Sequence, residues 1–248
     1  MITQQIVSAI LKLAKPTERL LIVHSSLSNF KFPRTINFKF QVQQALLSLL
    51  QNGFSLVIPS FTFSYTKGNP FDLLRSSSEV GILGDWAREL GGFIRTPNPL
   101  FSVVTAGKNA QDILACNHED AYGSDSVIAS WEKLNGRIIM LGASWATCTF
   151  LHRMEHEFQV PYRYEKIFTF PADFGNGLTR PTLKAYVRNP EIKTEINFGI
   201  ISTTAREEGL ISTTHLNQGI VESIAVKQLA EHCRKKLAED IYFLVKKL

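Results

Sequence analysis

His152 and Glu155 are three positions apart in a segment whose pattern is typical of a helix from about residue 147 onward. Residues at this spacing share one face of a helix, so the imidazole and the carboxylate can meet. A carboxylate beside an imidazole fixes its tautomer and raises its basicity, which suits the ring to act as a general base. Such pairs also occur on many solvated helix faces, so spacing alone leaves a catalytic and a structural interpretation open.

A short strand and a turn of small residues come directly before this helix. Residues 137–141 are apolar enough to form a buried strand, which Gly142 can end. Hydroxyl residues follow, and either Thr147 or Thr149 can cap the first helical turn. Because active sites of α/β proteins usually lie where strands end, this context favours the catalytic interpretation of the histidine and the glutamate.

Cys148 lies between these two threonines and offers a thiol as an alternative nucleophile. We favour a small buried residue instead, because buried cysteines are common in protein cores. The three cysteines of the chain, which include Cys116 and Cys233, are far apart and odd in number. They fit a reducing cytoplasm better than a disulfide framework, and no metal-ligand spacing joins them, so we expect no bound metal.

The composition is that of an ordinary globular protein, with 44% hydrophobic and 20% charged residues in a chain of 248. This length allows one large core or two small ones. The first residues lack the charged start and apolar run of a signal peptide, and no stretch approaches the roughly 20 apolar residues of a membrane span. We therefore expect a cytoplasmic protein without a membrane span.

The net charge of +5 is mild, and the densest basic segments are 234–236 and 246–247. Both fall on an expected C-terminal helix, where they form either a solvated face or a surface that attracts a phosphorylated ligand. No nucleic-acid-binding motif accompanies the charge, so we expect no nucleic-acid partner. The sequence leaves the oligomeric state open, including a homo-oligomer.

Hydrophobic patterns predict alternating strands and helices in the first two thirds of the chain. Strands that end in loops rich in serine and threonine predict a mostly parallel sheet covered on both faces by helices. The expected strands are 19–24, 55–59, 101–106 and 137–141, and the expected helices are 3–14, 40–50, 84–90, 109–115 and 126–134.

The pattern changes after Pro161. Alternating and aromatic residues predict a β-rich excursion of antiparallel strands over residues 165–215. Residues 219–247 are expected to return to helix. No repeat and no linker-like stretch divides the chain, so we expect a single domain over residues 1–248 with the excursion inside it.

Two further segments carry groups that can hold a ligand. The loop 24–27 follows the first strand and offers hydroxyls and backbone N–H groups to an anion or an amide, although a helix cap and turn explain it equally well. Arg95 and Ser102 flank a segment with two prolines, and Arg95 can bind a phosphate or form a surface ion pair. Phosphate-binding and dinucleotide glycine loops are absent, and so is Gly-x-Ser-x-Gly, which argues against an α/β-hydrolase.

Four segments taken together resemble the aminoglycoside N3-acetyltransferase family. They are HSSL at 24–27, IPSFTF at 58–63, RTPNPLFSVVTAG at 95–107 and LGASWATCTFLHRME at 141–155. Their order and spacing are similar to those of the family across roughly residues 18 to 165. Each segment is weak alone, but four in order are fairly specific.

The resemblance implies a three-layer α/β/α sandwich with a mixed sheet. It also implies acyl transfer from acetyl-coenzyme A or another acyl-coenzyme A, directly to an amino group of an amino sugar and without a covalent enzyme intermediate. The catalytic residues that it implies are His152 and Glu155 with Thr149 before them. The cofactor-binding residues expected from it are His24, Ser25, Ser26, Leu27, Arg95, Ser102 and Val103.

The chain departs from the family pattern where the acceptor is expected. A histidine of the family pattern is replaced within residues 95–99, and Ser60 stands where the family usually has a threonine, a change that keeps the hydroxyl. Thr62 and Asp72 are expected to contact the acceptor. The acceptor is therefore either an aminoglycoside antibiotic, as in a resistance enzyme, or a biosynthetic amino sugar, such as a nucleotide-linked one. A non-catalytic coenzyme A-binding module and a thioester hydrolase are the alternatives from other classes.

Overall fold

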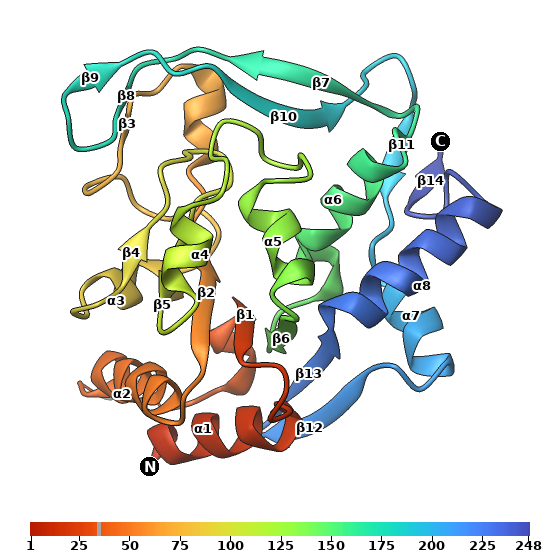
Figure 1. Cartoon of the computed structure of the whole chain (residues 1–248). Coiled ribbons are helices and arrows are strands. Elements are labelled where there is room, and N and C mark those ends of the chain that lie inside the picture. The colour runs from red at the N-terminus through yellow and green to blue at the C-terminus, as the bar shows by residue number, and fades with distance from the viewer. Residues whose placement is uncertain (34–35) are drawn as a thin grey trace.

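A seven-stranded mixed sheet forms the centre of the computed structural model, which describes residues 1–33 and 36–248 (Figure 1). In that part of the chain the strand order is β12-β13-β6-β1-β2-β5-β4. The bounds are Leu20–Ser25 for β1, Ser55–Pro59 for β2, Ile94–Arg95 for β4, Val103–Ala106 for β5, Arg137–Leu141 for β6, Ser212–Leu216 for β12 and Gly219–Ala225 for β13.

The sheet is parallel only at its centre, where β1 pairs with β2 on one side and with β6 on the other. The pairs β2–β5, β4–β5, β6–β13 and β12–β13 are antiparallel. The expectation of a mostly parallel sheet is therefore wrong, although the α/β/α sandwich with a mixed sheet is confirmed. A buried strand has the same apolar composition in either direction, so the sequence pattern could not reveal the direction of the outer strands.

The two faces of the sheet are covered by different helices. Side chains alternate across β1, so Leu20 and Ile22 enter one core while Leu21 and Val23 enter the other. The helices on the Leu21 face are α1 Ile2–Leu13, α2 Phe38–Gln51 and α3 Leu83–Arg88. Those on the Leu20 face are α4 Ala110–Leu114, α5 Val127–Lys133, α6 Phe150–Glu157, α7 Gly199–Glu207 and α8 Val226–Glu239.

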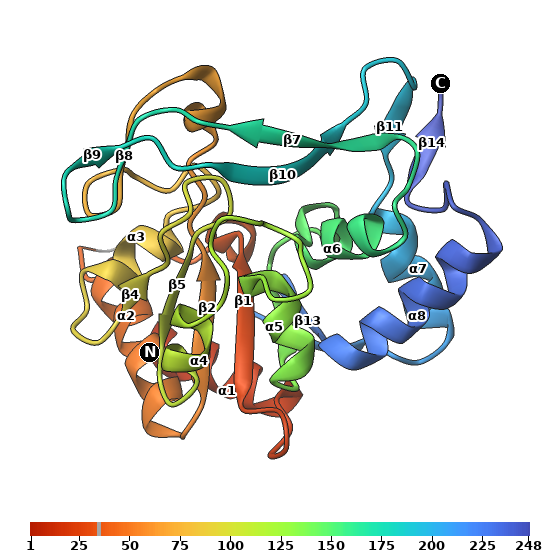
Figure 2. The ribbon, with the colours of Figure 1, turned by 45° about the horizontal axis from the view of Figure 1, so that its top comes forward.

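A two-stranded ribbon, β7 Arg163–Phe168 with β10 Leu183–Arg188, extends along one side of the molecule, away from the central sheet (Figure 2). It covers a third, smaller core that contains Tyr65, Phe71 and Leu100. This ribbon is the antiparallel excursion predicted from the sequence. The remaining short strands are β3 Phe71–Asp72, β8 Ala172–Asp173, β9 Leu178–Thr179, β11 Thr194–Ile196 and β14 Val245–Lys247.

Three elements of the C-terminal third differ from the prediction. One is β14, which lies inside the expected helix 219–247 and pairs with β11, whereas α8 already ends at Glu239. The helix α7, Gly199–Glu207, lies inside the expected β-rich excursion of residues 165–215. The strand β13 replaces the start of the expected helix, because its apolar residues Ile220, Val221 and Ile224 also fit a helical period. The segment forms a strand rather than a helix because it pairs with β6 on one side and with β12 on the other.

The helices of residues 1–33 and 36–248 include none that is both long and apolar enough to cross a membrane.

Candidate active site

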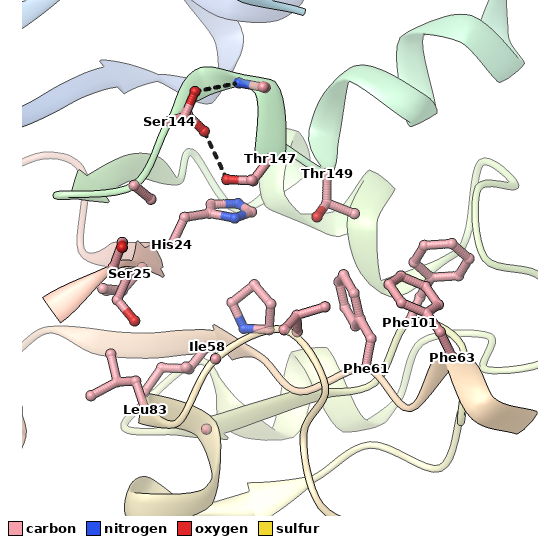
Figure 3. A pocket seen from close by; sticks show the side chains of 18 of the residues that line it. His24, Ser25, Ile58, Phe61, Phe63, Leu83, Phe101, Ser144, Thr147 and Thr149 are labelled. Carbon is pink, nitrogen blue, oxygen red and sulfur yellow. Dashed lines mark hydrogen bonds between the residues drawn. The ribbon is translucent and has the colours of Figure 1, made fainter. Parts of the chain in front are cut away.

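The parallel strands β1, β2 and β6 end at the same edge of the sheet, and the segments after them line a cavity of about 600 Å³ (Figure 3). Its wall also receives residues from the start of α6 and from the segment before and within α3. The wall contains Val23, His24, Ser25, Ser26, Asn29, Ile58, Pro59, Phe61, Phe63, Val80, Gly81, Leu83, Gly84, Phe101, Ala143, Ser144, Ala146, Thr147, Thr149 and His152.

The loops after β1 and β6 are held together at Gly142. Its φ of +70° lies in the left-handed region, and a Cβ there would lie 2.7 Å from the carbonyl oxygen of Ser26 and 2.9 Å from the Phe30 ring. The Asn29 amide donates to the Gly142 carbonyl at 2.8 Å. The chain therefore needs glycine at this position to bring both loops to one cavity.

The turn between β6 and α6 is closed by its own hydroxyls. The Ser144 Oγ accepts from the Ala146 N–H at 3.2 Å, and the Thr147 hydroxyl donates to the Ser144 carbonyl at 2.7 Å (Figure 3). Thr149 occupies the N-cap position of α6, but its side chain makes no cap hydrogen bond. Neither threonine caps α6 as expected, and the Thr149 side chain lies on the cavity wall instead.

His152 and Glu155 meet as their helical spacing predicts, with 2.6 Å between His152 Nδ1 and Glu155 Oε2. The Glu155 side chain is fully buried, whereas 21% of the His152 side chain is exposed. The same Glu155 oxygen lies 2.6 Å from Nε of Arg163, at the start of β7. The buried carboxylate of Glu155 thus contacts both the partly exposed imidazole of His152 and the guanidinium of Arg163.

The charges around this pair set its protonation. Burial lowers the pKa of His152, and the positive charge of Arg163 lowers it further, while Glu155 opposes both. Burial alone would raise the pKa of Glu155, but His152 and Arg163 outweigh it and lower that pKa. Near neutral pH the glutamate is therefore ionised and the imidazole neutral, which is the state in which it can accept a proton.

A second imidazole, that of His24, lies on the wall beneath the turn of Ser144 and Thr147 (Figure 3). Only 5% of this residue is exposed, and burial lowers its pKa to about 4. Its Nε2 is buried without a hydrogen-bond partner in the described part of the chain. The imidazole of His24 is therefore uncharged at neutral pH.

Aromatic rings form one end of the cavity. Phe61, Phe63 and Phe101 contact one another with ring centroids 5.2 to 6.0 Å apart (Figure 3). Phe101 continues to Tyr122 at 4.8 Å, and Tyr122 lies 6.0 Å from the His152 ring. The imidazole therefore stands beside a continuous apolar surface.

A second cavity, of about 590 Å³, shares Ser25, Ser26 and Gly81 with the first. Leu27 lies on its wall rather than on that of the first cavity. The same wall carries two cationic side chains, Lys31 and Lys39. The loop after β1 thus separates an apolar cavity that contains His152 from one that contains positive charge.

Five of the nine expected binding residues do not belong to the described wall of either cavity. Arg95 is 5% exposed and donates to the hydroxyls of Ser102 and Thr62 and to the carbonyls of Ser60 and Ser76. Val103 lies on β5, and its side chain is buried in the core on the Leu20 face of the sheet. Arg95, Thr62 and Ser102 therefore fasten the loop after β2 to β5, because these groups satisfy one another inside the protein.

Asp72 is also outside both walls. Its Oδ1 accepts the backbone N–H groups of Leu74 and Arg75 at 2.8 and 2.9 Å, so the carboxylate closes a turn. Its expected role at the acceptor is not supported by this position.

Cys148 is fully buried beside the cavity, and burial raises the pKa of its thiol to about 12. Such a thiol carries almost no thiolate at neutral pH, and thiolate is the reactive form. The described residues contain no cluster of His, Cys, Asp and Glu side chains that could hold a metal ion.

The sequence did not single out Arg163, Tyr122 or Lys31. Arg163 lies just before the segment 165–215 that was predicted as β-structure, and nothing in its spacing links it to Glu155 on α6. Of the three, only Lys31 could have been found from the sequence. It is a basic residue that closely follows the loop 24–27, which was expected to bind an anion or an amide.

Known proteins resemble this chain in sequence and in fold. The model of the family described as aminoglycoside 3-N-acetyltransferase matches residues 22–238. Aminoglycoside N(3)-acetyltransferase III of Pseudomonas aeruginosa is 31% identical over 106 residues, which are 41% of this chain and 38% of that relative. The alignment thus spans less than half of the relative's length.

Solved structures share the fold. The apoenzyme of the aminoglycoside acetyltransferase AAC(3)-IVa is 21% identical with a TM-score of 0.78, covering 98% of this chain and 90% of that one. AAC-IIIb, solved as a binary complex with CoASH, is 20% identical with a TM-score of 0.81, covering 96% of each chain. Since the family model spans most of the sequence, this chain belongs to the aminoglycoside 3-N-acetyltransferase family.

Proposed function

We propose that the protein transfers an acetyl group from acetyl-coenzyme A to an amino group of an amino sugar. The observation that carries this proposal is the His152–Glu155 pair, which faces a cavity at the ends of β1, β2 and β6. Family membership supports the same reaction class.

His152 acts as the general base in this proposal. An amine near neutral pH is mostly protonated, and its attacking form needs a proton removed. The imidazole accepts that proton, and Glu155, ionised and 2.6 Å away, stabilises the resulting imidazolium. General-base assistance of this kind typically accelerates a reaction by about 10²–10⁴-fold.

Acetyl-coenzyme A, when bound, supplies a thioester whose carbonyl carbon is open to attack by the amine. The carbonyl oxygen gains negative charge during attack, which a hydrogen-bond donor stabilises. Thr149 lies on the same cavity wall as His152 and has no cap hydrogen bond, so its hydroxyl can donate. The neutral ring of His24 provides a further polar group on that wall.

The lining of the two cavities supports coenzyme A as the acyl donor. A thiol-bearing arm suits the apolar cavity beside His152, and phosphates suit the neighbouring cavity that contains Lys31 and Lys39. The loop of Ser25 and Ser26 lies on both walls and would contact the arm between them. Lys39 also pairs with Glu89, which leaves Lys31 as the stronger candidate for a phosphate.

An aminoglycoside antibiotic is the second candidate acceptor, favoured by the family's description. AAC(3)-IVa has been solved as a histidine-to-alanine mutant in complex with a gentamicin and in complex with apramycin. A thioester hydrolase and a non-catalytic coenzyme A-binding module remain the alternatives of other classes.

Release of free thiol from acetyl-coenzyme A distinguishes these functions. The protein is mixed with acetyl-coenzyme A and a thiol reagent, with and without a panel of amino sugars. Release that requires an amine supports the proposal, and release without an amine indicates a hydrolase. Calorimetric binding of coenzyme A without release under any condition indicates a binding module.

A further inference from the structure

We infer that Tyr162 is a positioning residue for the proposed base, because its hydroxyl donates a hydrogen bond to Oε1 of Glu155. Oε1 is the carboxylate oxygen that His152 and Arg163 leave free. This inference rests on the proposed acetyl transfer, in which His152 removes a proton from the amine. It concerns how the base is held and does not depend on where the acceptor binds.

Glu155 contacts His152 and Arg163 through only one of its two oxygens. Oε2 lies 2.6 Å from Nδ1 of His152 and 2.6 Å from Nε of Arg163. Oε1 is buried and has no hydrogen-bond partner of regular geometry among residues 1–33 and 36–248. An ionised carboxylate that is fully buried is costly to leave half satisfied, so Oε1 needs a donor.

The hydroxyl of Tyr162 is a buried donor in the same situation. Only 1% of this residue is exposed, and its Oη has no partner of regular geometry in the described part of the chain. The ring packs against Tyr242, with ring centroids 5.6 Å apart, and belongs to the core that contains Leu151 and Met154 of α6. A buried phenol normally finds an acceptor for its O–H group.

The path of the chain after α6 brings this donor to the carboxylate. The Val160 N–H donates to the Glu155 carbonyl at 3.2 Å, which turns the chain back toward α6 directly before Tyr162. Burial raises the pKa of Tyr162, and the negative charge of Glu155 raises it further, while Arg163 opposes both. The carboxylate and the phenol are therefore neighbours, and each offers what the other lacks.

A donor on Oε1 affects the proposed base in two ways. It fixes the plane of the carboxylate, so that Oε2 keeps its contact with Nδ1 of His152. It also draws negative charge away from Oε2, so the carboxylate stabilises the imidazolium less. We therefore expect Tyr162 to hold the imidazole in place and to lower the pKa of His152.

The other tyrosines that face Glu155 remain uncharged near neutral pH. Burial raises the pKa of Tyr122 and that of Tyr186, and the charge of Glu155 raises both further. Arg163 is the cation that contacts the carboxylate. The change in charge at this site near neutral pH thus belongs to His152.

Charged groups of the elements packed against α6 have partners elsewhere. Glu132 of α5 and Arg234 of α8 pair with each other, and Arg234 also pairs with Glu157 at the end of α6. Burial lowers the pKa of His156, which follows His152 by about one turn. The titration of His156 must therefore be separated from that of His152.

Tyr162→Phe removes the hydroxyl and keeps the ring, and Tyr186→Phe is the matched control. The Tyr186 hydroxyl donates to the Val160 carbonyl at 2.9 Å, so it holds backbone rather than the carboxylate. NMR titration of the Cε1–H signals of the six histidines measures the pKa of His152 directly, and the signal missing from His152→Ala identifies it. The acid limb of kcat/KM, with the best acceptor of the amino-sugar panel, measures it through the reaction.

We expect Tyr162→Phe to raise both midpoints by about 0.3 to 1, a fraction of the roughly 1–3 that a full charge nearby produces. Tyr186→Phe should leave both at their wild-type positions. Tyr162→3-fluorotyrosine should lower both, because the fluorine makes the phenol more acidic and hence a stronger donor. This variant also keeps the inference testable if Tyr162→Phe does not fold.

The outcomes separate the hydrogen bond from the reaction. A pKa of His152 that is the same in folded Tyr162→Phe and in the wild type overturns the inference. An equal rise in Tyr186→Phe also overturns it, because packing rather than the hydroxyl would then set the pKa. A value that is unchanged or higher in Tyr162→3-fluorotyrosine does so as well. If the NMR midpoint moves and the acid limb does not, the hydrogen bond stands and His152 is not the base, which overturns the proposed mechanism instead.

Discussion

Arg163 Nε lies 2.6 Å from the Glu155 oxygen that also contacts His152, so a single buried oxygen joins β7 to the proposed base on α6. His152 and the guanidinium together lower the pKa of Glu155 and keep it ionised. Burial lowers the pKa of His152, and the positive charge of Arg163 lowers it further. We therefore expect Arg163 to affect the proposed reaction through His152 and Glu155, without itself contacting the substrate.

Arg163→Gln should move the acid limb of the kcat/KM profile to higher pH, because removal of the positive charge raises the pKa of His152. Arg163→Lys keeps the charge and should leave the limb near its wild-type position. The pH profiles of the three proteins measure this shift. Arg163→Gln should also lose about 3–5 kcal/mol of stability, since it leaves a buried carboxylate with one partner fewer. A profile unchanged in folded Arg163→Gln would show that the arginine only holds β7.

The pH profile of the wild type should itself rise through a midpoint below the ordinary histidine value of 6.5, since the protein lowers the pKa of His152. Protonated His152 cannot accept the proton of the amine, so activity is lost as pH falls through that midpoint. The amine of the acceptor adds a second limb at higher pH. An acceptor with a less basic amine should move that second limb and leave the first where it is.

His152→Ala should lower kcat by at least about 10²-fold and leave the affinity for coenzyme A nearly unchanged. Glu155→Gln should lower kcat less, because the ring would remain in place without its anionic partner. Steady-state kinetics and calorimetry measure the two effects separately. If His152 only packs α6 against its neighbours, stability and coenzyme A binding would fall along with the rate. Near-wild-type turnover of folded His152→Ala would exclude it as the base.

Cys148→Ser should retain most of the activity, because burial raises the pKa of this thiol to about 12 and leaves it unreactive. Stability is expected to fall by about 1 kcal/mol, as is common for a substitution at a fully buried site. Mass spectrometry of the enzyme during turnover provides the check. An acetyl group trapped on Cys148 would contradict direct transfer to the amine.

Gly142→Ala should destabilise the protein by more than about 1 kcal/mol and weaken coenzyme A binding. The added Cβ would collide with the loop after β1 as well as strain a φ of +70°. Gly177→Ala is the matched control, since Gly177 has a φ of +91° and open space around its Cβ position. Denaturant unfolding and calorimetry of both variants separate the collision from the strain. If both variants lose the same stability, then the contact of Gly142 with the loop after β1 contributes nothing to the stability of the protein.

His24 should make the protein less stable in acid. Its pKa is about 4 when folded and 6.5 when exposed, so between these values the unfolded chain binds a proton that the folded protein does not. Stability from this group is complete above pH 6.5 and falls as pH decreases toward 4, by up to about 3 kcal/mol. His24→Gln should flatten this part of the profile, as measured by urea unfolding at several pH values. If the free energy of unfolding of both proteins changes with pH in the same way, then protonation of His24 does not destabilise the folded protein.

Local patterns in the sequence determined the elements nearest the site. The strand 137–141, the helix that follows it and the meeting of His152 with Glu155 were predictable because each depends on neighbours a few residues apart. The loop at residues 24–27 was likewise predictable from the strand before it, and the structure places it along the walls of the two cavities. Resemblance over four separated segments supplied the family, which the comparison over residues 22–238 confirms.

Relations between distant residues were decided only by the tertiary structure. The direction of the outer strands depends on pairing across the sheet, and the replacement of a helix by β13 depends on strands at both of its edges. Arg95 and Asp72 are polar enough to bind a ligand, but the folded chain satisfies both internally. Arg163 reaches Glu155 because the chain turns back after α6, where the Val160 N–H donates to the Glu155 carbonyl and the Arg163 N–H to the Val160 carbonyl. Which residues line the cavity is likewise decided only by the folded chain. The sequence specifies which polar side chains are present. Only the folded structure determines which of them are satisfied by partners inside the protein and which remain available to a ligand.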